Sequence, residues 1–441
     1  MNIIKSILDI LSATLMDPEL LAKARRKPGA FTRKGGLLPY LLVVQILISK
    51  KQRSYGAILS EFFQNLQERM EISVEDTPIC SHQALSKARA GIDHSIFQAC
   101  FEKVTDYACQ HNKIHYEHIK GLSQPIQVIA FDGSRLPLPG RKKLLAHFGG
   151  LGTDGSSPTA LVSTAFDGCS RLILDASIGP LAPGERAMAI KHMDALVKKK
   201  SVDFKNALLV FDRGYASEKM IRYISQTIGS KFLFRLKSKF NVKIDNVPDP
   251  STLDEIVDQN IELYDGLIVR VIKFYITDTI VETLITNDFN IDNTEFKRLY
   301  FMRWPIEENY KVLKNKIGLP NFRGYSENSI YQEFWICVLF DNIVHIIKRD
   351  TDEIIKQEQD KSPKVNKHQY QTNMNELVGC LSRYICGYLE THDDDKKMSI
   401  IKYIYNFATK NRVVDKKGTG ESNPRKEPRK TKYYYNVKDT H

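Results

Sequence analysis

The fold is decided by the stretch IQVIAFDGS, which runs from residue 126 to residue 134. Residues 126–131 are apolar apart from Gln127, and a short apolar run rich in β-branched residues predicts a buried strand. Asp132 follows this run directly, and burying a charged acid there is costly unless the strand ends at an open edge or the acid is paired. Gly133 then lets the chain turn away.

The same pattern returns in the stretch ALLVFDRGY at residues 207–215, where a second apolar run ends in Asp212. Each acid alone is typical of an ordinary turn at the end of a strand. Two such acids favour a shared site, because ligands of open α/β sheets bind at the carboxyl ends of the strands.

The segments around these stretches predict an α/β fold, a mixed five-stranded sheet flanked by helices. The predicted strands are 126–131, 160–166, 172–178, 207–211 and 231–236, and the predicted helices are 185–198 and 217–228. Asp167 and Gly168 indicate a hairpin between the second and third strands. A β-rich insertion is predicted at about 238–290, with strands at 267–275 and 280–286.

Four parts are expected along the 441 residues. They are a helical N-terminal domain over 1–120, an α/β domain with its insertion over 121–349, a helical C-terminal region over 350–409 and a basic disordered tail over 410–441. Long helical stretches are predicted at 294–316 and 330–349, a polar linker at 350–367 and a further helix at 377–389.

The chain is basic, with 64 Lys and Arg against 52 Asp and Glu, a net charge of +12. Between Lys410 and Lys438 there are ten Lys and Arg but three acids. This balance favours a polyanionic partner, with nucleic acid ahead of a membrane surface. Any one basic cluster is also typical of a solvated face, so charge supports this interpretation without deciding it.

Seven scattered cysteines without a CxxC pair argue against a disulfide framework or a structural zinc module and favour a reducing cytoplasm. The N-terminal 16 residues lack the features of a signal peptide, and the apolar run at 37–49 is too short to span a bilayer. We therefore expect a cytoplasmic protein. The sequence contains no GxxxxGK[ST] loop, which argues against NTP-driven chemistry.

A third acid lies in the stretch YFMRWPIEENYKVLK at residues 300–314. At about 100° per residue, Tyr300, Arg303, Glu307 and Lys314 fall within an arc of roughly 60° on one helix face, whereas Glu308 falls well off it. The alternative is a solvated face with Arg303 and Glu307 as an ordinary i,i+4 ion pair. Pro305 is expected in the first turn of a helix, so Tyr300 and Arg303 can belong to a preceding turn.

This spacing resembles the Y-R-E-K signature of bacterial insertion-sequence DDE transposases of the insertion-sequence-four family. The surrounding motifs Asp132-Gly133-Ser134, Asp212-Arg213-Gly214-Tyr215 and Phe322-Arg323-Gly324-Tyr325-Ser326 are similar too, over roughly residues 125–345. The resemblance implies an RNase-H-like catalytic core with a β insertion between the second Asp and the Glu. It also implies that Asp132, Asp212 and Glu307 are catalytic and hold two Mg²⁺ or Mn²⁺ ions, while Tyr300, Arg303 and Lys314 contact the DNA backbone.

The chemistry agrees with this resemblance, since two hard cations held by carboxylates both activate a nucleophile and stabilise the leaving oxygen of a phosphodiester. Arg303 suits bidentate phosphate contacts and Lys314 acts as a point charge. Arg323 is a weaker candidate DNA contact. Trp304 suits stacking on an unpaired base, or equally a place in the core.

We therefore expect a cut-and-paste transposase acting on double-stranded DNA, both terminal inverted repeats and target, as a homodimer in the DNA complex. The helical N-terminal domain is expected to bind the terminal repeat. Two alternatives remain: a domesticated or inactive transposase-derived DNA-binding protein, and an RNase-H-fold nuclease without strand transfer. The three intact carboxylates argue against decay, and the Y-R-E-K spacing argues against a nuclease alone.

Overall fold

A computed structural model gives the arrangement of the chain. It describes residues 2–27, 29–31, 40–48, 56, 59–60, 63–64, 67, 73, 75, 80–111, 114–152, 155–182, 184–264, 266–361 and 368–415. The predicted basic tail lies outside the described residues beyond Asp415, as do the basic residues at 33, 34, 50, 51 and 53. The chain divides into two compact units, one formed by Met1–Val104 with Asn315–His441 and the other by Thr105–Lys314. The domain boundaries expected from composition stay predictions.

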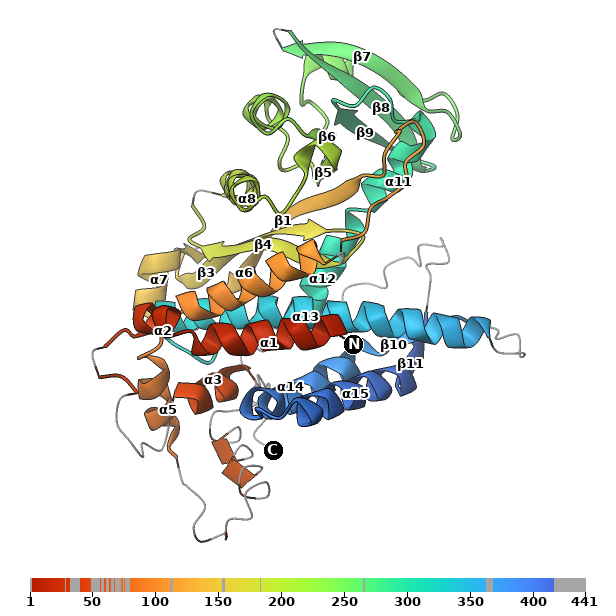
Figure 1. Ribbon diagram of the computed structural model, residues 1–441. Helices are drawn as coiled ribbons and strands as arrows, with labels where there is room; N and C mark the ends of the chain where they lie inside the picture. The colour runs from red at the N-terminus through yellow and green to blue at the C-terminus, as the bar shows by residue number, and fades with distance from the viewer. Residues whose placement is uncertain are drawn as a thin grey trace. The chain divides into compact units, whose positions relative to one another are not determined.

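The unit Thr105–Lys314 is built on one mixed sheet (Figure 1). Its strands are β1 (Gln127–Pro137), β2 (Gly150–Leu151), β3 (Ser157–Asp167), β4 (Leu172–Gly179), β5 (Ala207–Phe211), β6 (Lys231–Arg235), β7 (Val257–Tyr264), β8 (Leu267–Thr277) and β9 (Ile280–Thr286). The spatial order is β2-β3-β1-β5-β6-β9-β8-β7, with β4 also paired to β3. The α/β prediction is confirmed, and the five predicted core strands are β1, β3, β4, β5 and β6.

The directions of these five strands follow from their pairing. β3 is antiparallel to both β1 and β4, whereas β5 is parallel to both β1 and β6. The insertion strands β8 and β9 were predicted, and β9 pairs with β6, so the insertion continues the core sheet. β7 was not predicted, because its exposed sequence VDQNIELY lacks a regular apolar alternation.

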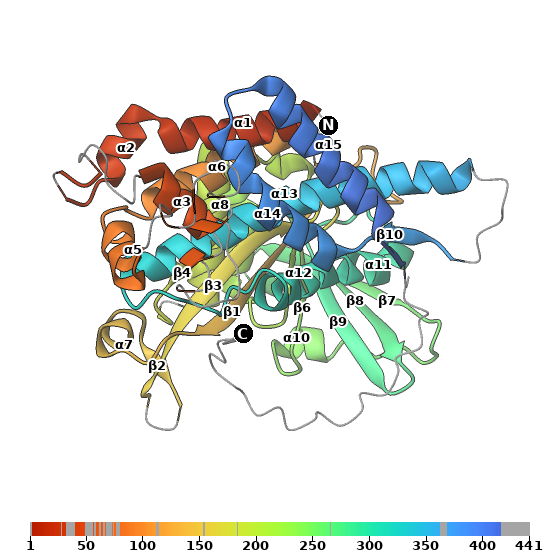
Figure 2. The same ribbon diagram turned by 90° about the horizontal axis from the view of Figure 1, so that it is seen from below.

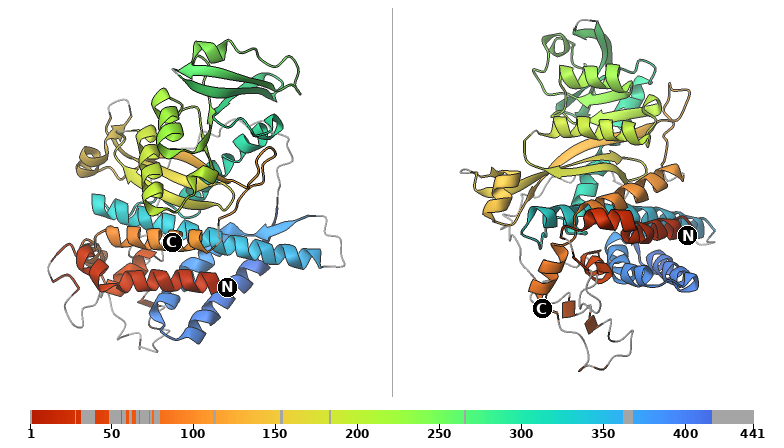
Figure 3. Two further views of the ribbon diagram at one scale, coloured as in Figure 1. Left: turned by 45° about the horizontal axis from the view of Figure 1, so that its top comes forward. Right: turned by 60° about the vertical axis from the view of Figure 1, so that its left-hand side comes forward.

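Helices cover the sheet on both faces. In this unit they are α7 (Lys142–Phe148), α8 (Glu185–Lys199), α9 (Glu218–Arg222), α10 (Val242–Asp245), α11 (Phe296–Phe301) and α12 (Trp304–Asn315), with short turns at Phe204–Asn206, Tyr223–Ile228 and Asn293–Glu295. The right-hand view of Figure 3 shows α8 and α9 on the same side of the strands. Ser217 caps α9 as predicted, its hydroxyl accepting from the Met220 N–H at 3.3 Å.

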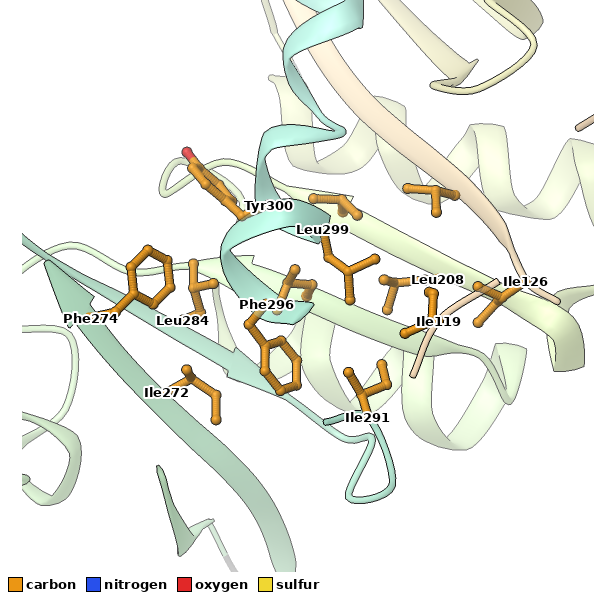
Figure 4. Close-up of a cluster of buried hydrophobic side chains, with 13 residues drawn as sticks. Ile119, Ile126, Leu208, Ile272, Phe274, Leu284, Ile291, Phe296, Leu299 and Tyr300 are labelled. Atoms are coloured by element: carbon orange, nitrogen blue, oxygen red, sulfur yellow. The ribbon is translucent and has the colours of Figure 1, made fainter. Parts of the chain in front are cut away.

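The apolar face beneath α11 forms a core cluster of 13 buried residues (Figure 4). It joins residues of β1, β5, β6, β8 and β9 to α11, whose Phe296 and Leu299 point into it. On β1 and β5 these core residues are Val128, Leu208 and Val210. Because side chains alternate along a strand, Asp132 and Asp212 share the face of the sheet that α11 covers.

The other unit is helical. Its described elements are α1 (Asn2–Met16), α2 (Pro18–Ala24), α3 (Tyr40–Ile48), α5 (His82–Arg89), α6 (Ser95–Gln110), α13 (Glu327–Asp360), α14 (Met374–Glu390) and α15 (Asp394–Lys410), with the strand pair β10 (Tyr370–Thr372) and β11 (Arg412–Val414). α1, α14 and α15 pack along α13 (Figure 2). α6 begins here and continues past Val104 into the sheet-containing unit.

α13 is longer than predicted. Residues 350–360 were expected to be a polar linker, but the helix continues to Asp360 because Thr351 and Ile355 keep a buried stripe facing the core. By length and composition alone α13 could cross a membrane, yet 94% of its most apolar window is buried inside the protein. α14 confirms the helix predicted at 377–389.

Candidate active site

Asp132 and Asp212 lie next to each other on neighbouring parallel strands. Phe131 of β1 is the register partner of Phe211 of β5, and each aspartate is the next residue along its strand. Adjacent strands are about 4.8 Å apart, and both side chains point to the same face. The structure therefore brings the two predicted acids together.

One detail of that prediction is wrong, because Asp132 does not end its strand. β1 continues to Pro137 and stays paired with β3. The pairing of β1 with β5 does end just before Asp132, because Phe211 is the last residue of β5. The sheet therefore opens on one side of β1, and this open edge gives Asp132 the accessible position that a buried charge requires.

The register extends to a third strand and adds a residue that sequence reasoning missed. Phe211 is the partner of Phe234, so Arg235 at the end of β6 stands beside Asp212. The rings of Phe131, Phe211 and Phe234 stack at centroid distances of 4.9 and 4.6 Å on the opposite face. The three stacked rings therefore lie one position before Asp132, Asp212 and Arg235 on the same three strands, and they fix the alignment of these charged residues. The signal was present in the sequence, since Arg235 comes directly after the apolar residues 232–234 of a predicted strand.

Arg235 joins several groups at this edge of the sheet. Its Nη1 lies 3.8 Å from Asp212 Oδ1 and donates a hydrogen bond to the Tyr300 hydroxyl at 3.3 Å. Its Nε donates to Glu282 Oε1 at 2.7 Å. Burial raises the pKa of Glu282 against the opposing effect of Arg235. Arg235 therefore provides positive charge on the side of Asp212 away from Asp132.

The segment that carries Glu307 is not one straight helix. α11 ends at Phe301, Met302 and Arg303 form a turn, and α12 starts at Trp304 with Pro305 in its first turn. The structure confirms the expected place of Pro305, which lacks an N–H and fits only at the start of a helix. Of the two alternatives for these residues, the single helix face is wrong and the break before Pro305 is confirmed, because Tyr300 lies in α11 and Arg303 in the turn. The turn and the two helices bring them near the two strand ends instead.

Arg303 and Glu307 form an ion pair, with Nη2 of Arg303 2.6 Å from Oε1 of Glu307. Arg303 is only 5% exposed, lies 5.7 Å from the centroid of the Tyr300 ring, and has a buried Nε without a hydrogen-bond partner among the described residues. Asp212 is close enough to raise the pKa of Arg303. The ion-pair alternative therefore describes the contact correctly, but the pair lies inside the site and not on a solvated face.

Glu308 points away from this group. Its side chain is 44% exposed and accepts hydrogen bonds from Nη1 and Nη2 of Arg171 at 3.3 Å. Of the two neighbouring glutamates, Glu307 is the one placed beside the aspartates.

α12 is fixed across β1 by polar contacts. The buried Tyr310 hydroxyl donates to the backbone oxygen of Asp132 at 2.9 Å and lies 3.2 Å from the Thr164 hydroxyl. Lys314 Nζ donates to Ser134 Oγ at 2.6 Å, and burial lowers its pKa. Lys314 thus lies over β1 two residues beyond Asp132, as part of the same site.

Burial shapes the electrostatics of Asp132. It raises the pKa of the carboxyl to about 7, against the Gly133 N–H at 2.9 Å and the Arg303 guanidinium, which lower it. The carboxylates of Glu185 and Glu307 raise the pKa further. Asp132 therefore lies among carboxylates whose charge Arg303 only partly offsets.

The two weaker candidates lie in different places. Trp304 is 45% exposed, with Lys311 Nζ 5.5 Å from its ring centroid, so it is not a core residue. Arg323 belongs to the helical unit, where its backbone N–H donates to the buried carboxylate of Glu333 at 3.0 Å. Arg89 Nη1 lies 2.9 Å from the same Glu333, so this ion pair holds the Arg323-Gly324 turn in place.

The donors at the site suit a hard divalent cation. Among the described residues, no three His, Cys, Asp or Glu side chains stand close enough to form a ready metal centre. The donors are all carboxylates, and Asp212 Oδ1 is buried with no hydrogen-bond partner in the described part of the chain. Asp132 and Asp212 therefore fit such an ion, whereas Glu307 is bound to Arg303 here and would have to release it.

Comparison with known protein families agrees with this description. The family model described as a transposase DDE domain matches residues 123–342. Among solved structures, the chain is similar to the piggyBac transposase in its cryo-EM synaptic complex with hairpin DNA. That likeness has a TM-score of 0.46 and 11% identity and covers 91% of this chain and 85% of the other. No curated protein matches the sequence.

The matched segment contains Asp132, Asp212 and Glu307, together with the sheet, the turn and the helix that place them. It also contains Tyr300, Arg303 and Lys314. Every residue of the candidate site described above therefore lies in the segment that is similar to a transposase DDE domain.

Proposed function

We propose that this protein is a cut-and-paste transposase, which cleaves DNA at transposon ends and joins the 3′-hydroxyls to target DNA. One observation carries the proposal. Asp132 and Asp212 stand side by side on two parallel strands, with Glu307 beside them, inside the segment that matches a DDE domain. We also assign the chain to the insertion-sequence-four family of bacteria, on its Tyr300, Arg303, Glu307 and Lys314 spacing.

The core sheet is of the RNase-H-like kind. Three antiparallel strands in the order β4-β3-β1 continue into the parallel pair β5-β6. The first two acids stand on β1 and directly after β5, and the insertion leads from β6 to α11 and the third acid. This order of strands and acids supports the proposed core.

DDE transposases generally use divalent metal ions. We propose Mg²⁺ or Mn²⁺ as two ions held by Asp132, Asp212 and Glu307. When bound, such ions activate the attacking hydroxyl or water and stabilise the leaving oxygen of the phosphodiester. Asp132 and Asp212 would present their own carboxylate oxygens to the ions. Arg303 would hold Glu307 until a DNA phosphate competes for the guanidinium.

Phosphate contacts are proposed for Tyr300, Arg303 and Lys314, with Trp304 and Arg323 as further DNA contacts. An arginine bound to a single carboxylate oxygen can exchange this partner for the two oxygens of a phosphate. Lys314 is partly desolvated, and a phosphate beside it would restore the charged form that burial disfavours. Binding of DNA would therefore give Arg303 and Lys314 a phosphate partner and would release Glu307 from Arg303.

The partners follow from the same proposal. They are double-stranded DNA with terminal inverted repeats, target DNA, and a second copy of the chain when two ends are held together. The N-terminal helical domain is proposed to read the repeat. The net charge of +12 supports a polyanionic partner. The proposed location is the bacterial cytoplasm, at the nucleoid when DNA is bound.

The test is a strand-transfer assay on the DNA that flanks the gene, which should contain short inverted repeats. We expect cleaved ends and joined products with Mg²⁺, and neither with Asp132→Ala or Glu307→Ala. Cleaved ends that are never joined would favour a nuclease, and binding without cleavage would favour an inactive DNA-binding protein. Full activity of either variant would disprove the metal assignment.

A further inference from the structure

A fourth carboxylate reaches the site from the opposite face of the sheet. Glu185 is the first residue of α8, and a Cβ on Gly133 would lie 2.7 Å from its Cγ and 3.1 Å from its Oε1. Gly133 directly follows Asp132 on β1. Only a residue without a side chain at 133 leaves room for Glu185 at the open edge of β1.

A second contact holds the start of α8 against this site. Arg186 Nε donates to the backbone oxygen of Gly214 at 2.8 Å, in the loop that follows Asp212. The first turn of α8 is thus attached to the same loop as the second catalytic aspartate. Glu185 is held between the two aspartate segments and is not a free surface side chain.

Electrostatics agree with this geometry. The carboxylates of Glu185 and Glu307 both lie close enough to Asp132 to raise its pKa. Glu307 has an arginine partner at 2.6 Å, whereas Glu185 has no hydrogen-bond or ion-pair partner among the described residues. Glu185 is therefore the more available of the two glutamates in this structure.

A buried hydroxyl near these acids also lacks a partner. Tyr215 is 1% exposed, and its hydroxyl makes no hydrogen bond within the described chain. Burial raises its pKa well above the usual value, and the charges of Asp132, Glu185, Tyr310 and Asp212 are close enough to raise it further. A buried hydroxyl without a protein partner beside several acids favours a polar ligand at this position, such as the water of a bound cation.

We propose that Glu185 is a fourth carboxylate of this site and binds the divalent cation together with Asp132 and Asp212. Mg²⁺ and Mn²⁺ take about six oxygen ligands in all, and Glu185 would add a third carboxylate to those of Asp132 and Asp212, with water in the remaining positions. Glu185 supplies this carboxylate while Glu307 remains on Arg303, so the cation is held before DNA arrives. This inference rests on the proposed metal-dependent transposase function.

The competing explanation is that Glu185 only stabilises the start of α8. An acid in the first turn of a helix interacts favourably with the helix dipole. That role predicts a lower melting temperature for Glu185→Gln without metal and unchanged metal binding. The ligand role predicts the reverse, since removing one of several mutually repelling carboxylates leaves the metal-free protein as stable as before, or more so.

The test measures Mn²⁺ binding to the full chain without DNA, by calorimetry and by the rise in melting temperature. We expect Glu185→Gln to weaken Mn²⁺ binding at least about tenfold and to reduce the Mn²⁺-induced rise. Glu218→Gln is the matched control. Glu218 also begins a helix, α9, but accepts from Arg222 Nε at 2.8 Å, so its Mn²⁺ affinity should equal that of wild type.

Asp212→Asn separates the failure of this inference from failure of the proposed function. If Asp212→Asn weakens Mn²⁺ binding and Glu185→Gln does not, Glu185 is not a ligand and the transposase site stands. If wild type binds no Mn²⁺, or Asp212→Asn binds as tightly as wild type, the metal site and this inference both fail. Gly133→Ala provides a second variant, because its Cβ displaces Glu185 while every carboxylate remains, and it should weaken Mn²⁺ binding as well.

Discussion

At the scale of single residues, the neighbouring glutamates Glu307 and Glu308 differ in what they contact. Glu307 bonds to the buried Arg303 beside Asp132, whereas the exposed Glu308 bonds to Arg171. We expect Glu307→Gln to lower DNA cleavage at least about 100-fold, since even outer partners of metal ligands are worth 10–100-fold. The measurement is the cleavage rate at saturating Mg²⁺.

Glu308→Gln is the control for this prediction. It removes the same charge one residue away and loses only an exposed ion pair, which contributes about 0–1 kcal/mol. Cleavage should stay within about twofold of wild type, because a change this small leaves the site intact. Equal losses in both variants would mean that overall charge, and not the position of Glu307, supports cleavage.

At the scale of elements, α11 places the turn that carries Arg303 by packing on the sheet. Leu299 is completely buried in the cluster of Figure 4, whereas Phe301 on the same helix is 47% exposed. Leu299→Ala should lower the free energy of unfolding by about 2–5 kcal/mol. Phe301→Ala should change it by less than about 1 kcal/mol. Urea denaturation of both variants measures this difference, and similar values would contradict the packing of α11.

A second prediction concerns the contact of α1 with α14 and α15. Lys5, Lys397 and the Tyr388 hydroxyl each donate to Asp9, at 2.8, 2.8 and 2.9 Å. Burial raises the pKa of Asp9, but these hydrogen bonds outweigh it and hold the pKa below its usual 3.8. A lowered pKa stabilises the fold above the unfolded value, and this contribution is lost as the pH falls through the folded value.

Asp9→Asn should therefore cost about 1 kcal/mol near pH 7, a value reduced for the partial exposure of Asp9, and much less near pH 3. Melting temperatures of wild type and variant at both pH values measure the effect. Asp254→Asn, at an exposed position, is the control and should match wild type at both. A difference that stays constant with pH would show that Asp9 acts through packing and not charge.

At the scale of the whole molecule, the sequence beyond Asp415 is predicted to increase general DNA affinity. It contains eight Lys and Arg, counted from Lys416 to Lys438. Each phosphate neutralised by a protein releases counterions, so binding weakens as salt rises. Removing residues 416–441 should reduce the slope of log affinity against log salt. The slope is measured on a DNA without terminal repeats, and an unchanged slope would exclude the tail from binding.

The sequence by itself determined the class of the fold and predicted that Asp132, Asp212 and Glu307 share a site. Short apolar runs of β-branched residues predict where buried strands lie, because this property is local, but not where each strand ends: β1 continues past Asp132 to Pro137. The place of Pro305 was also readable, because proline fits only the first turn of a helix. These features depend on neighbouring residues along the chain.

Tertiary structure alone decided which residues meet at the site. The alignment of Asp132, Asp212 and Arg235 depends on the register of three strands that lie far apart in the sequence. The approach of Glu185 depends on a glycine more than 50 positions away, at 133, that leaves space for it. Register and close approach arise from packing between distant segments, so no local pattern encodes them.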